Sequence, residues 1–194
     1  VPLPYTIRGQ LERIGDPASA SYPFSARYAY HANGTVSEAE FYNAGAPSGQ
    51  PKRYKYTFGT GSYDALNRLK SADYSYWSGS GWASTLAYDL AGIGYDKSGN
   101  LTALQRYRGD GTLVDNLSYG YLAGTNRLGS VTDAVGTTTE AWDAESGSFT
   151  YDANGNLKTA PAPYSITAVT YDHRNLPLSV TARGVVTTYR YDQG

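Results

Sequence analysis

Short stretches in which tyrosine alternates with a smaller or polar residue recur along the chain. A period of two places both tyrosine rings on one face of an extended strand, and tyrosine favours such half-buried, pleated surfaces. The pattern therefore predicts many short strands, each with one aromatic face. They are centred on Tyr28-Ala29-Tyr30, Tyr54-Lys55-Tyr56, Tyr74-Ser75-Tyr76, Tyr119-Gly120-Tyr121 and Tyr189-Arg190-Tyr191.

Turn-forming residues follow several tyrosines. An aspartate comes directly after the tyrosine, then Asn-Gly, Ser-Gly or Asn-Arg, and then a leucine. The aspartate side chain can accept hydrogen bonds from backbone N–H groups two residues on, and Asn-Gly fits the positive φ angles of a tight hairpin turn. This pattern predicts a β-hairpin whose leucine returns to the core on the next strand.

The strand–turn–strand unit is an internal repeat. Its full form, Y-D-x-x-(G/N)-(N/R)-L, occurs three times, and degenerate copies begin at Tyr30 and Tyr121. The last three Tyr-Asp pairs are evenly spaced by 20 residues, about the length of two short strands with two turns. The residues that carry the repeat are Tyr63, Asp64 and Leu69; Tyr95, Asp96, Gly99 and Leu101; Tyr151, Asp152, Gly155 and Leu157; Tyr171 and Asp172; and Tyr191 and Asp192.

The repeat predicts an all-β fold of tandem antiparallel β-hairpins. A single hairpin is only marginally stable in water, so we expect the hairpins to pair into one strongly curved, spiralling sheet of roughly a dozen strands. We expect one continuous array over residues 1–194, in which residues 1–27 are a leading segment and residues 28–194 are repeats. We expect no helix beyond short turns.

Composition narrows the function classes. The chain has 20 Tyr and 22 Gly, only 17% charged residues and a net charge of −1. It has no long basic run, which argues against nucleic-acid binding. The absence of Cys excludes disulfides, thiolate zinc sites and a cysteine nucleophile, and no apolar run approaches the roughly 20 residues that span a bilayer.

Candidate catalytic and metal-binding residues are few. Both histidines, His31 and His173, fall in the turn motif, where a solvated side chain is commoner than a base. Asp152–Asn156 superficially matches a calcium loop, but its glycine and the twelfth residue do not fit. We expect no enzyme activity, no cofactor and no metal. Two carboxylate pairs remain as glycosidase candidates on an all-β scaffold, namely Glu38 with Glu40 and Asp143 with Glu145.

The three tryptophans lie near stretches rich in glycine and serine. Aromatic rings stack on the faces of sugars, so Trp77, Trp82 and Trp142 are candidate ligand contacts. The alternative interpretation is that each tryptophan covers the core at a strand end. We favour this alternative, and glycan binding stays open as a remote possibility.

The repeat residues resemble the RHS family, also called the YD-repeat family. The three strings that carry the resemblance are YDALNRL at 63–69, GYDKSGNL at 94–101 and YDANGNL at 151–157. Such repeats are common in very large secreted or cell-surface proteins of bacteria, including wall-associated proteins. The resemblance implies a spiralling β-sheet that in well-known members closes into a shell around a C-terminal toxin domain. Related repeats in animal teneurins build a shell used in cell–cell contact.

The resemblance implies a structural shell or scaffold segment that encapsulates or presents a C-terminal toxin domain. The alternative is a surface adhesion or filament module without cargo. The D-P-x-G junction of toxin-bearing members is absent from these residues, and we expect both ends to be cuts in a longer chain. The expected partners are the rest of the parent chain and, through open sheet edges, other copies or surface proteins.

Overall fold

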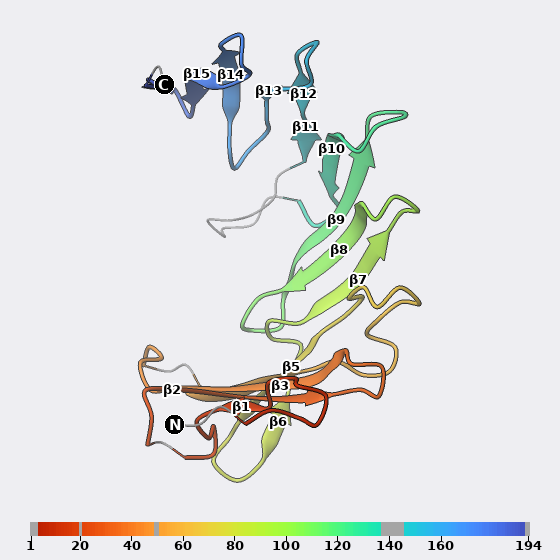
Figure 1. The fold of residues 1–194 in the computed structure, drawn as a ribbon, viewed down its shortest axis with the longest axis vertical. Coiled ribbons are helices and arrows are strands. Elements are labelled where there is room, and N and C mark those ends of the chain that lie inside the picture. The colour runs from red at the N-terminus through yellow and green to blue at the C-terminus, as the bar shows by residue number, and fades with distance from the viewer. Residues whose placement is uncertain (1–3, 20, 49–50, 137–145, 193–194) are drawn as a thin grey trace. The chain divides into compact units, whose positions relative to one another are not determined.

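The computed structural model describes residues 4–19, 21–48, 51–136 and 146–192. These residues form β-strands, turns and loops without any helix, so the predicted all-β class of antiparallel hairpins is confirmed (Figure 1). The strands of the described residues are β1 (Arg13–Ile14), β2 (Phe24–Tyr30), β3 (Val36–Asn43), β4 (Arg53–Thr57), β5 (Asp73–Trp77), β6 (Trp82–Ser84), β7 (Leu90–Tyr95), β8 (Leu101–Tyr107), β9 (Leu113–Tyr121), β10 (Leu128–Asp133), β11 (Gly147–Ser148), β12 (Thr150–Tyr151), β13 (Leu157–Thr159), β14 (Ile166–Tyr171), β15 (Pro177–Ala182) and β16 (Val185–Thr188).

The chain divides into two compact units. One unit comprises Val1–Ile93 with Arg106–Thr112, and the other comprises Gly94–Gln105 with Leu113–Gly194. Every sheet follows chain order from strand to strand, as expected for successive hairpins. The sheets have the orders β1-β2-β3-β4-β5-β6, β11-β10-β9-β8-β7, β12-β13 and β14-β15-β16.

The six-stranded sheet has two chemically different faces, because side chains alternate along each strand. Its aromatic face is a row of ring contacts that crosses β2 to β5. The ring of Phe41 lies 6.1 Å from that of Tyr28 and 5.5 Å from that of Tyr54, and the ring of Tyr54 lies 6.0 Å from that of Tyr74. Tyr74 is the most buried of these rings at 5% exposure. The tyrosine-rich strand face predicted from the alternation is therefore the core of this sheet.

The opposite face of the same sheet carries charges. Arg27, Glu40 and Lys55 are cross-strand neighbours on β2, β3 and β4. Oxygens of Glu40 lie 2.6 Å from nitrogens of both Arg27 and Arg53, and the Lys55 amine lies 2.6 Å from Glu38. We call these five residues the charged face. Glu40 is only 1% exposed, which the sequence pattern did not predict.

The other unit consists of smaller hairpins. Leu117 of β9 and Val131 of β10 are buried, and they lie on the same face of the sheet because Val131 pairs with Tyr119, two residues after Leu117. The three-stranded sheet β14-β15-β16 ends in a strand whose residues are all exposed. Val185 and Val186 of β16 are 66% and 61% exposed. The fully buried interior is small, and half-buried rings contribute much of the packing.

Candidate functional site: the tyrosine turns and the tryptophan pair

The Tyr-Asp turns share one backbone geometry, shown by residues 151–157. Tyr151 and Leu157 are cross-strand partners that close the hairpin. Inside it, the Asp152 N–H donates to the Asn156 carbonyl at 2.9 Å, and the Gly155 N–H donates to the Asp152 carbonyl at 3.0 Å. Gly155 has a φ of +89°. This is a turn followed by one left-handed residue, the arrangement of a three-residue hairpin loop with a bulge.

This geometry corrects the sequence prediction at one point. Asn-Gly at 154–155 was expected to take the positive φ angles of a tight hairpin turn. Only the glycine, four places after the tyrosine, is left-handed in the structure. Asn67 and Asn175 occupy the same slot in their turns with φ of +61°, because asparagine tolerates this region better than most residues with a side chain.

The aspartate side chain caps each turn. One carboxylate oxygen accepts from the backbone N–H groups two and four residues on, and the other accepts from a nearby side chain. In the turn of Asp152, the donors are the backbone N–H of Asn154, the backbone N–H of Asn156 and the side-chain amide of Asn156, at 2.9, 2.8 and 3.0 Å. The pKa values of Asp64, Asp96, Asp152 and Asp172 are lowered, mainly because the residue four positions later donates hydrogen bonds to the carboxylate.

Sequence reasoning missed two turns with the same backbone. In the first, the Thr6 hydroxyl replaces the aspartate and accepts from the N–H groups of Arg8 and Gln10 at 3.2 and 3.1 Å. In the second, the Arg108 N–H donates to the Thr112 carbonyl at 2.8 Å. In both cases a tyrosine comes directly before the turn, and a left-handed glycine lies within the turn at the usual spacing. This spacing was the signal in the sequence that could have identified both turns.

One Tyr-Asp pair has a different role. Tyr88 has a φ of +58°, and Asp89 is 8% exposed and accepts from the Tyr74 backbone N–H at 2.6 Å. Burial raises the pKa of Asp89. This aspartate joins two strands of one unit instead of capping a turn.

Tyrosine hydroxyls link several repeats to an earlier one. The acceptor is the backbone carbonyl of the residue that closes the preceding hairpin, six or seven places after its tyrosine. We call this hydrogen bond the tyrosine link. Six such links are Tyr30 to Leu11 (2.6 Å), Tyr63 to Val36 (2.8 Å), Tyr121 to Leu101 (2.8 Å), Tyr151 to Leu128 (2.9 Å), Tyr171 to Leu157 (2.7 Å) and Tyr191 to Pro177 (2.9 Å).

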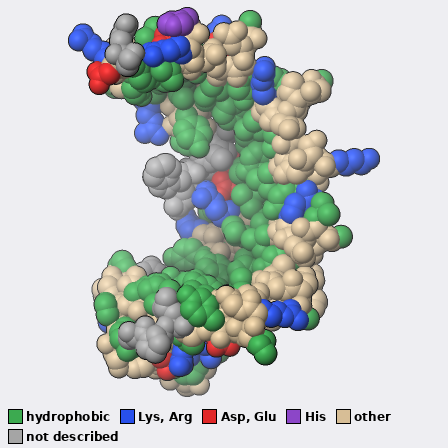
Figure 2. Space-filling model, in the orientation of Figure 1, with side chains coloured by type: hydrophobic (Ala, Val, Ile, Leu, Met, Phe, Trp, Pro, Cys, Tyr) green, Lys and Arg blue, Asp and Glu red, His purple; other side chains and the backbone are tan. Residues whose placement is uncertain are grey.

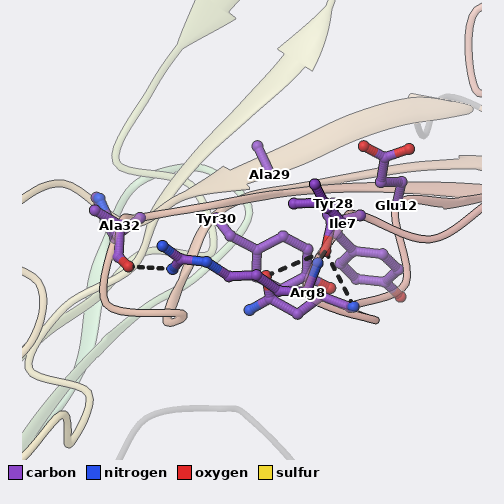
Figure 3. A pocket seen from close by; sticks show the side chains of 10 residues that line it. Ile7, Arg8, Glu12, Tyr28, Ala29, Tyr30 and Ala32 are labelled. Carbon is purple, nitrogen blue, oxygen red and sulfur yellow. Dashed lines mark hydrogen bonds between the residues drawn. The ribbon is translucent and has the colours of Figure 1, made fainter.

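Side-chain amides connect successive turns as well. The Asn33 amide donates to the Asn67 side chain at 2.9 Å, and the Asn154 amide donates to the Asn175 side chain at 3.1 Å. Between the first two turns, the Arg8 guanidinium reaches the Ala32 carbonyl beside the Tyr30 ring (Figure 3). Neighbouring turns are therefore held together by polar contacts in addition to the sheet.

The predicted repeat residues fall into these positions. Asp96 caps its turn through the N–H groups of Ser98 and Asn100, with Gly99 left-handed at +87°. Leu101 supplies the carbonyl that accepts from Tyr121. The turn of Tyr63 is closed by Leu69. Tyr191 makes a tyrosine link, and Asp192 is the last described residue and is exposed.

The structure places two of the three tryptophans together. Trp77 is the last residue of β5 and Trp82 the first of β6, and the two are cross-strand partners. Their rings lie 5.7 Å apart, edge to face. The Arg53 guanidinium lies 4.7 Å from the Trp77 ring centre and 5.1 Å from that of Trp82. The Lys55 amine lies 4.7 Å from the Trp82 ring centre. Trp142 lies outside the described residues.

The carboxylate pairs considered for glycoside hydrolysis have different outcomes. Glu38 and Glu40 belong to the charged face, where each is ion-paired to Lys or Arg. Asp143 and Glu145 lie outside the described residues. The His31 ring nitrogen lies 2.7 Å from the Phe58 carbonyl, which ties this ring to the backbone.

Three features of the described residues concern charge, metal ligands and hydropathy. On the face shown in Figure 2, Lys and Arg side chains stand in separate groups. Among the described residues, no cluster of three or more His, Cys, Asp or Glu side chains could hold a metal ion. No helix in the described ranges is long and apolar enough to cross a membrane.

Comparison with known proteins gives no family. The chain matches no protein-family model, and a search of curated proteins finds no match.

Proposed function

We propose that this chain is a scaffold segment of an RHS-type, YD-repeat protein, secreted by or displayed on a bacterium. In this role the hairpins wall a shell that encapsulates or presents a C-terminal toxin domain. The tyrosine link is the observation that carries the proposal. Six repeat tyrosines donate a side-chain hydrogen bond to the backbone of an earlier repeat, so a hairpin is completed by its neighbour and the array can be extended unit by unit.

The chemistry of the turns supports a scaffold role. The repeat aspartates use their oxygens to cap backbone N–H groups, and the repeat tyrosines use their hydroxyls on backbone carbonyls. These polar groups are thereby engaged in holding the chain, as expected of residues selected for structure.

An adhesion or filament module without cargo is the second candidate. The exposed valines of β16 and its position at the edge of a sheet favour it, since unpaired edge strands can bind another chain.

Electron microscopy of the intact parent protein, with limited proteolysis alongside, separates the two candidates. A closed cavity walled by these repeats, with a protease-resistant C-terminal domain inside, is expected for encapsulation. An open rod or filament with nothing inside would exclude the shell function and favour adhesion.

A further inference from the structure

A cavity of about 330 Å³ lies beside the tryptophan pair. Tyr42, Lys52, Arg53 and Trp77 line it, and the segments at 17–18 and 78–79 form its other walls. The volume is at the low end of the range for small-molecule sites, roughly 300 to 1,000 Å³. It suits one or two sugar rings better than a larger ligand.

The aromatic rings of this cavity come from a single row of the sheet. Tyr42 on β3 is the cross-strand partner of Arg53 on β4, and Trp77 on β5 pairs with Trp82 on β6. The Arg53 guanidinium lies over both tryptophan rings and the Lys55 amine lies over Trp82; Trp82 does not line the cavity. Trp77 and Tyr42 are therefore the rings that line the cavity, and the Trp82 ring meets that of Trp77 edge to face.

The positive charge of the cavity is incompletely neutralised. The Nε of Arg53 donates to Glu40 at 2.6 Å, while its terminal nitrogens have no acceptor among the described residues. A guanidinium has five N–H donors in total, so four of them have no acceptor within the described ranges, while the face of the group lies over the Trp77 ring. Lys52 is exposed, and within the described ranges it has no carboxylate partner. The site thus combines ring faces with free cationic donors.

We propose that this cavity binds an acidic sugar residue, with the pyranose on Trp77 and Tyr42 and the carboxylate on Lys52 and the terminal nitrogens of Arg53. A ring face accommodates the C–H surface of a sugar, and a guanidinium matches a carboxylate in a bidentate geometry. A neutral sugar would leave the cations without partners, and a simple anion would leave the rings uncovered. The inference does not depend on the proposed scaffold function.

Titration with digalacturonate, followed by the indole N–H signals in NMR spectra of the ¹⁵N-labelled chain, tests the proposal. The Trp77 signal should shift saturably, and binding should weaken as salt is raised because the contact is ionic. The neutral digalactoside should bind at least tenfold more weakly. Equal binding of the neutral sugar, or equally tight binding of inorganic phosphate at the same signal, would overturn the proposal, as would no shift at all.

Two substitutions separate ligand contact from support of the fold. Lys52→Gln alters an exposed side chain, so it should keep the fold and lower affinity several-fold, while Lys70→Gln, a matched change at another exposed lysine, should leave affinity unchanged. Trp77→Ala should lower affinity at least tenfold, with folding checked by circular dichroism. If Lys52→Gln and Lys70→Gln bind alike, the cationic contact is wrong and the assignment fails.

Discussion

Removal of a single tyrosine link tests whether the repeats depend on one another. The Tyr171 hydroxyl donates to the Leu157 carbonyl at 2.7 Å, and burial raises the pKa of this tyrosine. Tyr171→Phe removes the hydroxyl and keeps the half-buried ring, so the packing of the ring is preserved. The change isolates one hydrogen bond between two successive hairpins.

The expected cost follows from the general worth of such bonds. A hydrogen bond within a protein contributes about 1 kcal/mol net, because water satisfies the same groups in the unfolded chain. A loss of that size raises the population of the locally open state about fivefold. The Asp172 N–H, which donates to the Leu176 carbonyl at 2.9 Å, should therefore exchange with solvent about fivefold faster.

Amide hydrogen exchange measured by NMR is the suitable assay, because local opening is resolved residue by residue. The control is Tyr164→Phe, since Tyr164 is 60% exposed and makes no tyrosine link. The amide of Asp96, in a different turn, should be unaffected by either change. Exchange at Asp172 within twofold of the parent, or an equal effect of Tyr164→Phe, would refute the role assigned to the link.

Three further predictions concern the turns and the charged face. Gly155→Ala forces a side chain into a φ of +89° and should lower the free energy of unfolding, measured by urea titration, by about 1–2 kcal/mol. The control is Gly61→Ala, at a site with open space and no positive φ, which should change this free energy by less than about 0.5 kcal/mol. Glu40→Gln removes the buried negative charge that pairs with Arg53 and Arg27 and should cost about 3 kcal/mol. Glu38→Gln, at a partly exposed pair, should cost less than about 1 kcal/mol; equal costs would contradict the importance of burial. Because the turn aspartates have pKa values lowered by folding, the stability they contribute is present above pH about 4, their unfolded pKa, and is lost as pH falls through the folded values. A urea midpoint that stays constant from neutral pH into this acidic range would contradict that role for Asp64, Asp96, Asp152 and Asp172.

The sequence alone determined the fold class and the place of most turns. Alternation of tyrosine with small residues has the period of a strand, and this period is a local property of the backbone. The aspartate followed by a residue that tolerates positive φ is equally local, because its hydrogen bonds span only four residues. Local signals of this kind can be read without knowing which strands meet.

Only the tertiary structure decided which backbone carbonyls accept hydrogen bonds from the repeat tyrosines. The tyrosine links join residues 14 to 27 positions apart, and no pattern within one repeat states which carbonyl will lie beneath the hydroxyl. The burial of Glu40 has the same origin, because it depends on Arg27 and Arg53 from strands on either side. Similarly, Trp77 becomes part of a cavity only because sheet pairing sets it beside Arg53 and Tyr42. Sequence periodicity specifies the face on which a side chain lies, whereas strand register specifies its neighbours.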